Sequence, residues 1–159
     1  MHFDASAIIH AWDNYPIANF PAFWDWVEVA IRSEKFAMSE IAFVEVKNKT
    51  PDCGEWLKNK GIRKIPLSDE VLVKAAEIKG ILGIIAENYH SNGVGENDLL
   101  IVSAAYIENA VLLTEESRQN ILPTQKRRYK IPSVCALDEV AVICSNVREL
   151  IATSGVVFR

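Results

Sequence analysis

The chain has 159 residues, of which 50% are hydrophobic and 24% charged, so it is long and apolar enough to bury a core of its own, and we expect one domain over residues 1–159. The formal net charge of -4 argues against a protein that binds nucleic acid through its overall charge, although it leaves room for a local basic patch. No apolar run approaches the about 20 residues of a membrane span, no secretion signal is recognisable, and the cysteines form no CxxC pair, so we expect a cytoplasmic protein with reduced thiols and no membrane contact.

Short apolar segments alternate with helical segments in the first third of the chain. The segment from His2 to Asp4 predicts a strand that runs directly into a helix, which ends before Pro16. Pro21 opens a second helix with an apolar stripe along one side. A short strand over 36–38 follows, and Ser39 is a good N-cap for a third helix.

The middle of the chain is predicted to be mainly helical. A short helix over 55–59 ends at Gly61, and residues 65–67 form a connector. Ser68 then caps a long helix from about Asp69 to Tyr89, which a turn over 91–95 separates from the next element.

The last third returns to the alternation of strand and helix. A strongly apolar helix runs from Asn97 or Asp98 to Asn109 and is followed by a strand over 111–113. A basic loop over 122–130 leads to a strand over 140–143, and Ser145 caps a closing helix that ends near residue 153. Strands that alternate with helices throughout predict an α/β fold, a three-layer helix–sheet–helix arrangement with a mainly parallel sheet.

Acidic residues lie where these strands end and helices begin, at Asp4, Glu45, Asp98 and Glu116. Open parallel sheets bind their ligands at the carboxyl ends of the strands, so these side chains can meet at one edge. Carboxylates gathered there would repel each other unless a cation joined them. Ligands that are all oxygen suit a hard ion such as Mg²⁺ or Mn²⁺. The pattern therefore predicts a metal-dependent phosphodiesterase site.

The segments around the acids carry recognisable motifs: D-A-S-A-I-I at the start, then M-S-E-I-A-F-V-E-V, N-D-L-L-I-V-S-A-A and V-L-L-T-E-E. In this order they resemble the acidic elements of the PIN-domain family of ribonucleases, which includes the VapC-type toxins. The segment F-P-A-F-W-D-W-V and the K-I-P-S-V-C tail resemble a PIN-like subfamily with a Trp-rich N-terminal segment. The resemblance covers the chain from end to end and implies a PIN-like fold.

The resemblance implies a role for each of the acids. Asp4, Glu45, Asp98 and Glu116 would be the catalytic residues and would hold Mg²⁺ or Mn²⁺. The hydroxyl groups of Ser6 and Thr114 would orient these carboxylates through hydrogen bonds. The simpler alternative for Asp4 and Asp98 is that each only caps the helix that follows it.

Two of these assignments choose between neighbouring acids. Glu40 directly follows Ser39 and is explained by the preference for acids in a first helical turn. The resemblance maps instead to Glu45, six residues after Ser39. Near the end of the fourth motif, the spacing from the threonine favours Glu116, and Glu115 remains the alternative.

A basic stretch offers a contact surface for RNA. Lys126, Arg127, Arg128 and Lys130 surround Tyr129. Cations that meet phosphates, together with an aromatic ring that stacks on bases, suit single-stranded RNA. The alternative is a solvated mobile loop.

The sequence thus predicts a metal-dependent endoribonuclease that acts as the toxin of a type II toxin–antitoxin system. The resemblance implies a small antitoxin partner that covers the acidic edge, and commonly a homodimer. Two other interpretations use the same residues: a non-catalytic PIN-like module that binds RNA or protein, and another phosphohydrolase with an acidic site.

Overall fold

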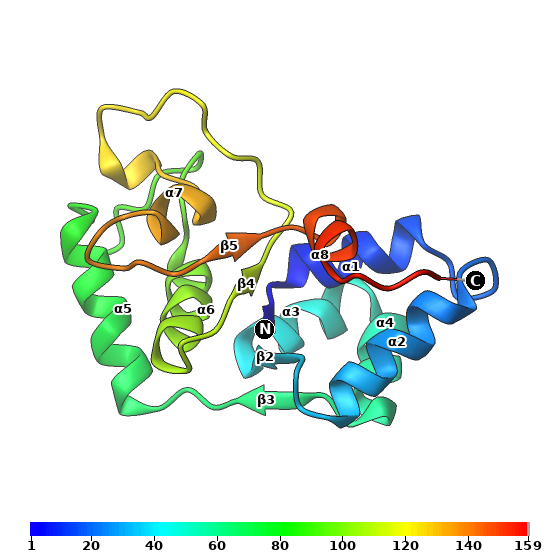
Figure 1. The fold of residues 1–159 in the computed structure, drawn as a ribbon. Coiled ribbons are helices and arrows are strands. Elements are labelled where there is room, and N and C mark those ends of the chain that lie inside the picture. The colour runs from blue at the N-terminus through cyan, green and yellow to red at the C-terminus, as the bar shows by residue number, and fades with distance from the viewer. Residues whose placement is uncertain (159) are drawn as a thin grey trace.

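The computed structural model describes residues 1–158, and its centre is a five-stranded sheet with the strand order β3-β2-β1-β4-β5 (Figure 1). Every neighbouring pair in this sheet is parallel. The strands are short: β1 (His2–Phe3), β2 (Ala37–Ser39), β3 (Arg63–Ile65), β4 (Leu112–Leu113) and β5 (Cys144–Ser145). The predicted α/β class with a parallel sheet is confirmed.

Helices cover both faces of this sheet. They are α1 (Ala5–Asn14), α2 (Pro21–Arg32), α3 (Glu40–Lys49), α4 (Pro51–Lys60), α5 (Asp69–Ile81), α6 (Glu96–Ile107), α7 (Ile131–Cys135) and α8 (Val147–Thr153), with a 3₁₀ turn over Lys126–Arg128. In Figure 1, α1 to α4 and α8 gather on one side, and α5, α6 and α7 on the other. The helix–sheet–helix prediction is therefore confirmed. No helix among residues 1–158 has both the length and the apolar character that a membrane span requires.

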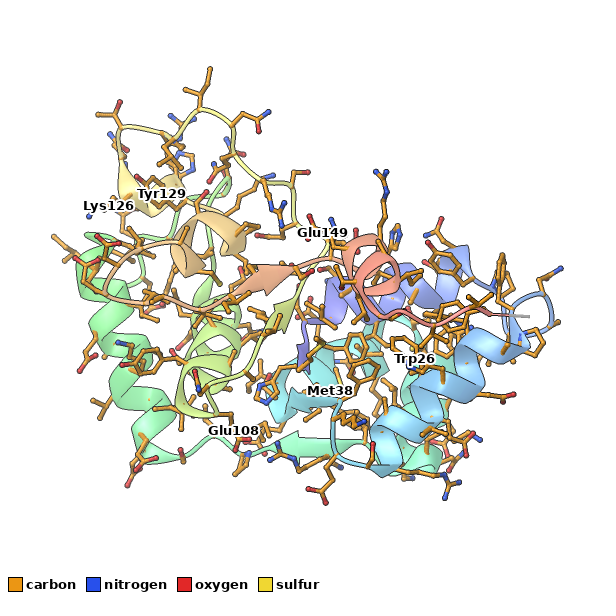
Figure 2. All side chains as sticks on the ribbon, viewed as in Figure 1. Trp26, Met38, Glu108, Lys126, Tyr129 and Glu149 are labelled. Carbon is orange, nitrogen blue, oxygen red and sulfur yellow. The ribbon has the colours of Figure 1, made fainter. Side chains whose placement is uncertain are left out.

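The central strands β1, β2 and β4 are buried on both faces, and most of their residues are apolar. Leu112 and Leu113 of β4 are fully buried, and Met38 of β2 lies in the middle of the molecule (Figure 2). On the side of α1 to α4, Trp24 is buried among aromatic rings and its indole N–H donates to the carbonyl of Tyr15. This packing belongs to the core on the side of the sheet where α1 to α4 lie.

Two predicted boundaries in the middle of the chain are wrong. The sequence predicts a connector at 65–67, but Ile65 belongs to strand β3, which pairs with β2 along its whole length. Helix α5 ends at Ile81 and not at Tyr89, because Gly83 takes a left-handed conformation with φ of 69° and reverses the chain. The residues beyond it form irregular turns.

The strand predicted at 140–143 is also wrong. Ala141 has a φ of 50° and the N–H of Val142 donates to the carbonyl of Cys135, so this segment turns back on α7. The ladder with β4 starts only at the carbonyl of Ile143 and gives β5 at Cys144–Ser145. As a result α8 is capped by Asn146, in a capping box with Glu149, and not by Ser145 as predicted.

We expect Gly54→Ala to destabilise the packing of α4 on α3. A Cβ atom at this position would lie 2.8 Å from the Cα of Lys47, so one helix must move. The loss of unfolding free energy should be about 1–3 kcal/mol, measured by urea denaturation. Gly80→Ala is the matched control, because its Cβ would meet nothing within 4 Å, and it should raise stability by about 0.5–1 kcal/mol. Equal effects of the two substitutions would contradict the close approach of α3 and α4.

Candidate active site

The predicted acids come from separate elements that share one edge of the sheet. Asp4 directly follows β1, and Glu116 lies just beyond β4. Glu45 lies on α3, which follows β2. Helix α6 leads into the start of β4, so its first turn, with Asp98, lies at the opposite edge, where the strands end. The negative charges of Glu116, Asp4 and Glu45 all raise the pKa of Asp98, so the fold brings the four acids into one neighbourhood.

Asp4 is the most firmly held of the acids. Its side chain is buried, with 4% of the residue exposed, and its Oδ2 accepts hydrogen bonds from the hydroxyls of Ser6 at 2.5 Å and Thr114 at 2.9 Å. Burial raises the pKa of Asp4, and the hydrogen bonds from the two hydroxyls oppose this rise. The side chain makes no helix-capping bond, so it does not act as a simple N-cap.

The same hydroxyls tie the end of β1 to the loop after β4. Ser6 Oγ accepts the N–H of Glu115 at 2.9 Å, and Thr114 Oγ1 accepts the N–H of Glu116 at 3.2 Å. Ser6 and Thr114 therefore fix both Asp4 and the backbone that carries the fourth acid. This is the orienting geometry that the sequence predicted for them.

Asp98 belongs both to the capping box of α6 and to the acidic neighbourhood. Its Oδ2 accepts the N–H of Gly95 at 2.8 Å, at the start of α6. Burial is the main cause that raises the pKa of Asp98 to about 6. The hydrogen bond from Gly95 opposes the rise, and the negative charges of Glu116, Asp4 and Glu45 add to it. The alternative that Asp98 is the N-cap is therefore wrong: Gly95 is the N-cap of α6, and Asp98 lies in its first turn and accepts the N–H of that residue in a capping box.

Glu115 and Glu116 have separate partners. Glu115 Oε1 accepts the N–H of Val147 at 2.8 Å, at the start of α8. Glu116 Oε2 accepts the N–H of Ile131 at 2.7 Å, at the start of α7. Burial raises the pKa of Glu116 and the charge of Asp4 adds to this rise. Glu116 is therefore the one whose charge is coupled to the other acids.

Glu40 and Glu45 also separate clearly. Glu40 Oε1 accepts the N–H of Leu67, in the connector after β3. Glu45 forms an ion pair with Lys49 one turn further along α3, and its charge raises the pKa of Asp4 and Asp98. The acid chosen from the resemblance is the one that lies near the others.

The donor set suits a hard divalent cation, but these side chains are not yet arranged around one. Among residues 1–158, no three His, Cys, Asp or Glu side chains lie close enough together to hold a metal ion. Asp98, Glu116 and Glu45 each have an oxygen bound to a backbone N–H or to Lys49. The carboxylates that raise one another's pKa would gain from a cation, since it removes their repulsion. Binding one would require side chains to turn from their present partners.

The basic stretch lies beside this edge. The N–H of Val94 donates to the carbonyl of Tyr129 at 2.9 Å, so the loop packs on the turn that precedes α6. The charge of Lys130 lowers the pKa of Glu116, which places this cation next to the acids. Lys126 and Arg128 are exposed, and Figure 2 shows Lys126 beside Tyr129. Tyr129 is buried with 8% exposed, so the prediction that its ring is free to stack on bases is wrong.

Gln119 holds the basic stretch in place and was missed by sequence reasoning. Its side-chain amide donates to the carbonyl of Arg128 at 3.1 Å and its oxygen accepts the N–H of Lys130 at 2.9 Å. The oxygen also accepts the hydroxyl of Ser133. The described loop is therefore anchored to the segment after β4, which argues against a freely mobile loop. No sequence signal marks such a glutamine, because its partners, two backbone groups and one hydroxyl, are brought to it by the folding of the loop.

The comparisons with known proteins agree with this architecture. The family model described as "Domain of unknown function (DUF4411)" matches residues 1–158, so the chain belongs to the DUF4411 family. Among solved structures, the chain is similar to a chain of VapBC2 from Rickettsia felis bound to a DNA fragment from their promoter. The TM-score is 0.57 at 19% sequence identity, and the match covers 91% of this chain and 96% of that chain. This likeness shows the fold, which is PIN-like. No match was found among curated proteins.

We expect the stability of the metal-free protein to fall between about pH 4 and about pH 6 because of Asp98. Its pKa is about 6 in the folded protein and about 3.9 in an unfolded chain. The folded state therefore binds more protons in this window, and the unfolding free energy decreases as pH rises. Relative to Asp98→Asn, the wild type should lose about 1–3 kcal/mol across the window.

The measurement is urea denaturation with EDTA at a series of pH values. The asparagine can still accept the N–H of Gly95, so the comparison isolates the charge. Parallel pH profiles for the two proteins would show that Asp98 ionises as it does in the unfolded chain.

Proposed function

We propose that this protein is a metal-dependent endoribonuclease that hydrolyses RNA phosphodiester bonds, with Mg²⁺ or Mn²⁺ as its cofactor. The observation that carries the proposal is the coupling of Asp4, Glu45, Asp98 and Glu116 at the carboxyl edge of the sheet in a PIN-like fold. A partly buried group of like charges is costly to keep in a protein unless it has a cationic ligand. Hydrolysis by a bound metal needs such a group and no covalent nucleophile.

Each acid has a definable task in this chemistry. The carboxylates would hold the metal, which when bound lowers the pKa of a water molecule and polarises a phosphoryl oxygen. Asp4 is the anchor, because Ser6 and Thr114 fix its orientation. Glu116 uses one oxygen on the N–H of Ile131 and has a second with which to orient a water.

The RNA would approach along the basic stretch. The basic residues that would bind phosphates are Lys126, Arg127, Arg128 and Lys130. Near the acidic edge, their charges would offset the repulsion between RNA and a chain whose net charge is -4. Of these four basic residues, Lys130 is the one next to the acids, because its charge lowers the pKa of Glu116. Because Tyr129 is buried, recognition by this stretch rests on charge and not on stacking.

The biological role we propose is that of the toxin in a type II toxin–antitoxin pair. The structural neighbour is VapBC2 bound to promoter DNA. By likeness to it, we infer an antitoxin partner and a complex that binds DNA. From the family resemblance we further infer that the antitoxin is small and covers the acidic edge, and that the chain forms a homodimer.

A second candidate is a non-catalytic PIN-like module that binds RNA or protein. The observation that favours it is that no three potential ligands among residues 1–158 are already arranged for a metal. Such a module would keep the basic stretch and lose the need for the acids. Metal-dependent cleavage separates the two candidates.

We expect Asp4→Asn and Asp98→Asn each to lower RNA cleavage by about a hundredfold or more, because each removes a charge on which metal binding depends. The measurement is cleavage of single-stranded and structured RNA with Mg²⁺, with Mn²⁺ and with EDTA. Lys58→Met, an exposed position on α4, is the control for handling and folding. Cleavage by the wild type in EDTA would refute the proposed site. Cleavage at the wild-type rate by both aspartate variants would refute it as well.

We expect Glu116→Gln to weaken Mn²⁺ binding and cleavage by about tenfold or more, and Glu115→Gln to leave both within about threefold. The two substitutions are chemically identical and adjacent. Glu115 bonds the start of α8, whereas Glu116 faces the acids. Calorimetric titration with Mn²⁺ and initial cleavage rates would provide the comparison. The reverse order of effects would assign the fourth acid to Glu115.

A further inference from the structure

Lys49 brings a positive charge to the acidic edge from within α3. Its ammonium donates a hydrogen bond to Glu45 Oε1, four residues earlier on the same helix. Both side chains line a groove between α3 and the start of α6, where Asn97 forms the opposite wall. Glu45 and Lys49 therefore share this groove, and Asp98 follows Asn97 in the first turn of α6.

The field of the acids acts on this lysine. The hydrogen bond with Glu45 is the largest cause that raises the pKa of Lys49, and the charges of Glu45, Asp4 and Asp98 add to it. Acids from three separate elements therefore stabilise one ammonium. At the same time its side chain is 63% exposed, so it can leave the pair and enter solvent at small cost.

We propose that Lys49 is the resident counter-cation of the acidic edge, that a divalent metal displaces it from Glu45, and that the released ammonium then binds a phosphate oxygen of the RNA. This inference rests on the proposed function. If Glu45 turned to ligate a metal, Lys49 would lose the acceptor Oε1 and the metal would replace its charge. A phosphate of the bound RNA would then be a new partner for the released ammonium.

If a metal displaces Lys49, removing this lysine should have opposite effects on the binding of the metal and of the RNA. Without Lys49 the acids have lost a competing cation, so metal should bind more tightly in the absence of RNA. Without Lys49 the RNA has lost a phosphate contact, so its KM should rise. A lysine with a purely structural role in α3 would not tighten metal binding.

The test is calorimetric titration of metal-free protein with Mn²⁺, comparing wild type, Lys49→Met, Lys49→Arg and Lys47→Met. Lys47 is the matched control, since it lies on the same helix and its Cα faces the site of Gly54 on α4. We expect Lys49→Met to bind Mn²⁺ about threefold to tenfold more tightly, from the loss of one nearby charge. Lys47→Met should stay within about twofold of wild type, and Lys49→Arg should remain close to it because the charge is kept.

Steady-state cleavage of single-stranded RNA at saturating Mn²⁺ provides the second measurement. Lys49→Met should raise KM more than it lowers kcat, and Lys49→Arg should restore part of the loss. If wild type binds Mn²⁺ but Lys49→Met binds it equally or more weakly, the role of Lys49 is refuted and the proposed nuclease stands. Equal tightening in Lys47→Met and Lys49→Met would also refute it, in favour of a general charge effect. If wild type binds no Mn²⁺, the proposed function fails, and this inference fails with it.

Discussion

Carboxylates that gather at the end of a parallel sheet repel one another, and the described structure meets this constraint with a separate partner for each acid. Two hydroxyls hold Asp4, backbone N–H groups hold Asp98 and Glu116, and Lys49 holds Glu45. Hydrogen bonds that favour the charged form oppose the cost of burial without removing the mutual repulsion. Burial is the main cause that still raises the pKa of Asp98 to about 6, and the charges of Glu116, Asp4 and Glu45 add to the rise. A divalent cation would relieve the mutual repulsion, which links the stability of the edge to its proposed chemistry.

The fold explains how such distant residues meet. Strand β1 lies at the centre of the sheet and is buried, so the residue after it has little freedom. Helix α6 runs back toward the start of β4, and its first turn therefore lies at the carboxyl edge. The basic stretch reaches the same edge because Gln119 ties it to the segment after β4. Local rules of strand and helix formation thus place acids and bases side by side, although they are far apart in the chain.

The sequence predicted the alternation of elements and the acids at their ends, because buried strands and helix starts leave strong local signals. It failed where the signal was short or the contact distant. Strands β3 and β5 lie at the edges of the sheet and are only partly buried, so they lack the apolar run that marks the central strands. The burial of Tyr129 and the anchoring by Gln119 depend on tertiary contacts with backbone groups, which no local pattern encodes. The backbone partner of Glu116 was invisible for the same reason, whereas the resemblance implied that Ser6 and Thr114 bond the carboxylates.

The partners also rank the acids by how readily each can change its arrangement. Asp4 is 4% exposed and held by two hydroxyls, so turning it would leave buried donors unpaired, at a cost of about 1–3 kcal/mol for each group. Glu45 is 25% exposed and paired with a lysine that is itself in solvent, so its exchange costs much less. A site of this kind has a fixed anchor and an adjustable acid. In the proposed metal site, the acid that turns to close the site would therefore be Glu45 on α3, and Lys49, which it would release, lines the groove beside it.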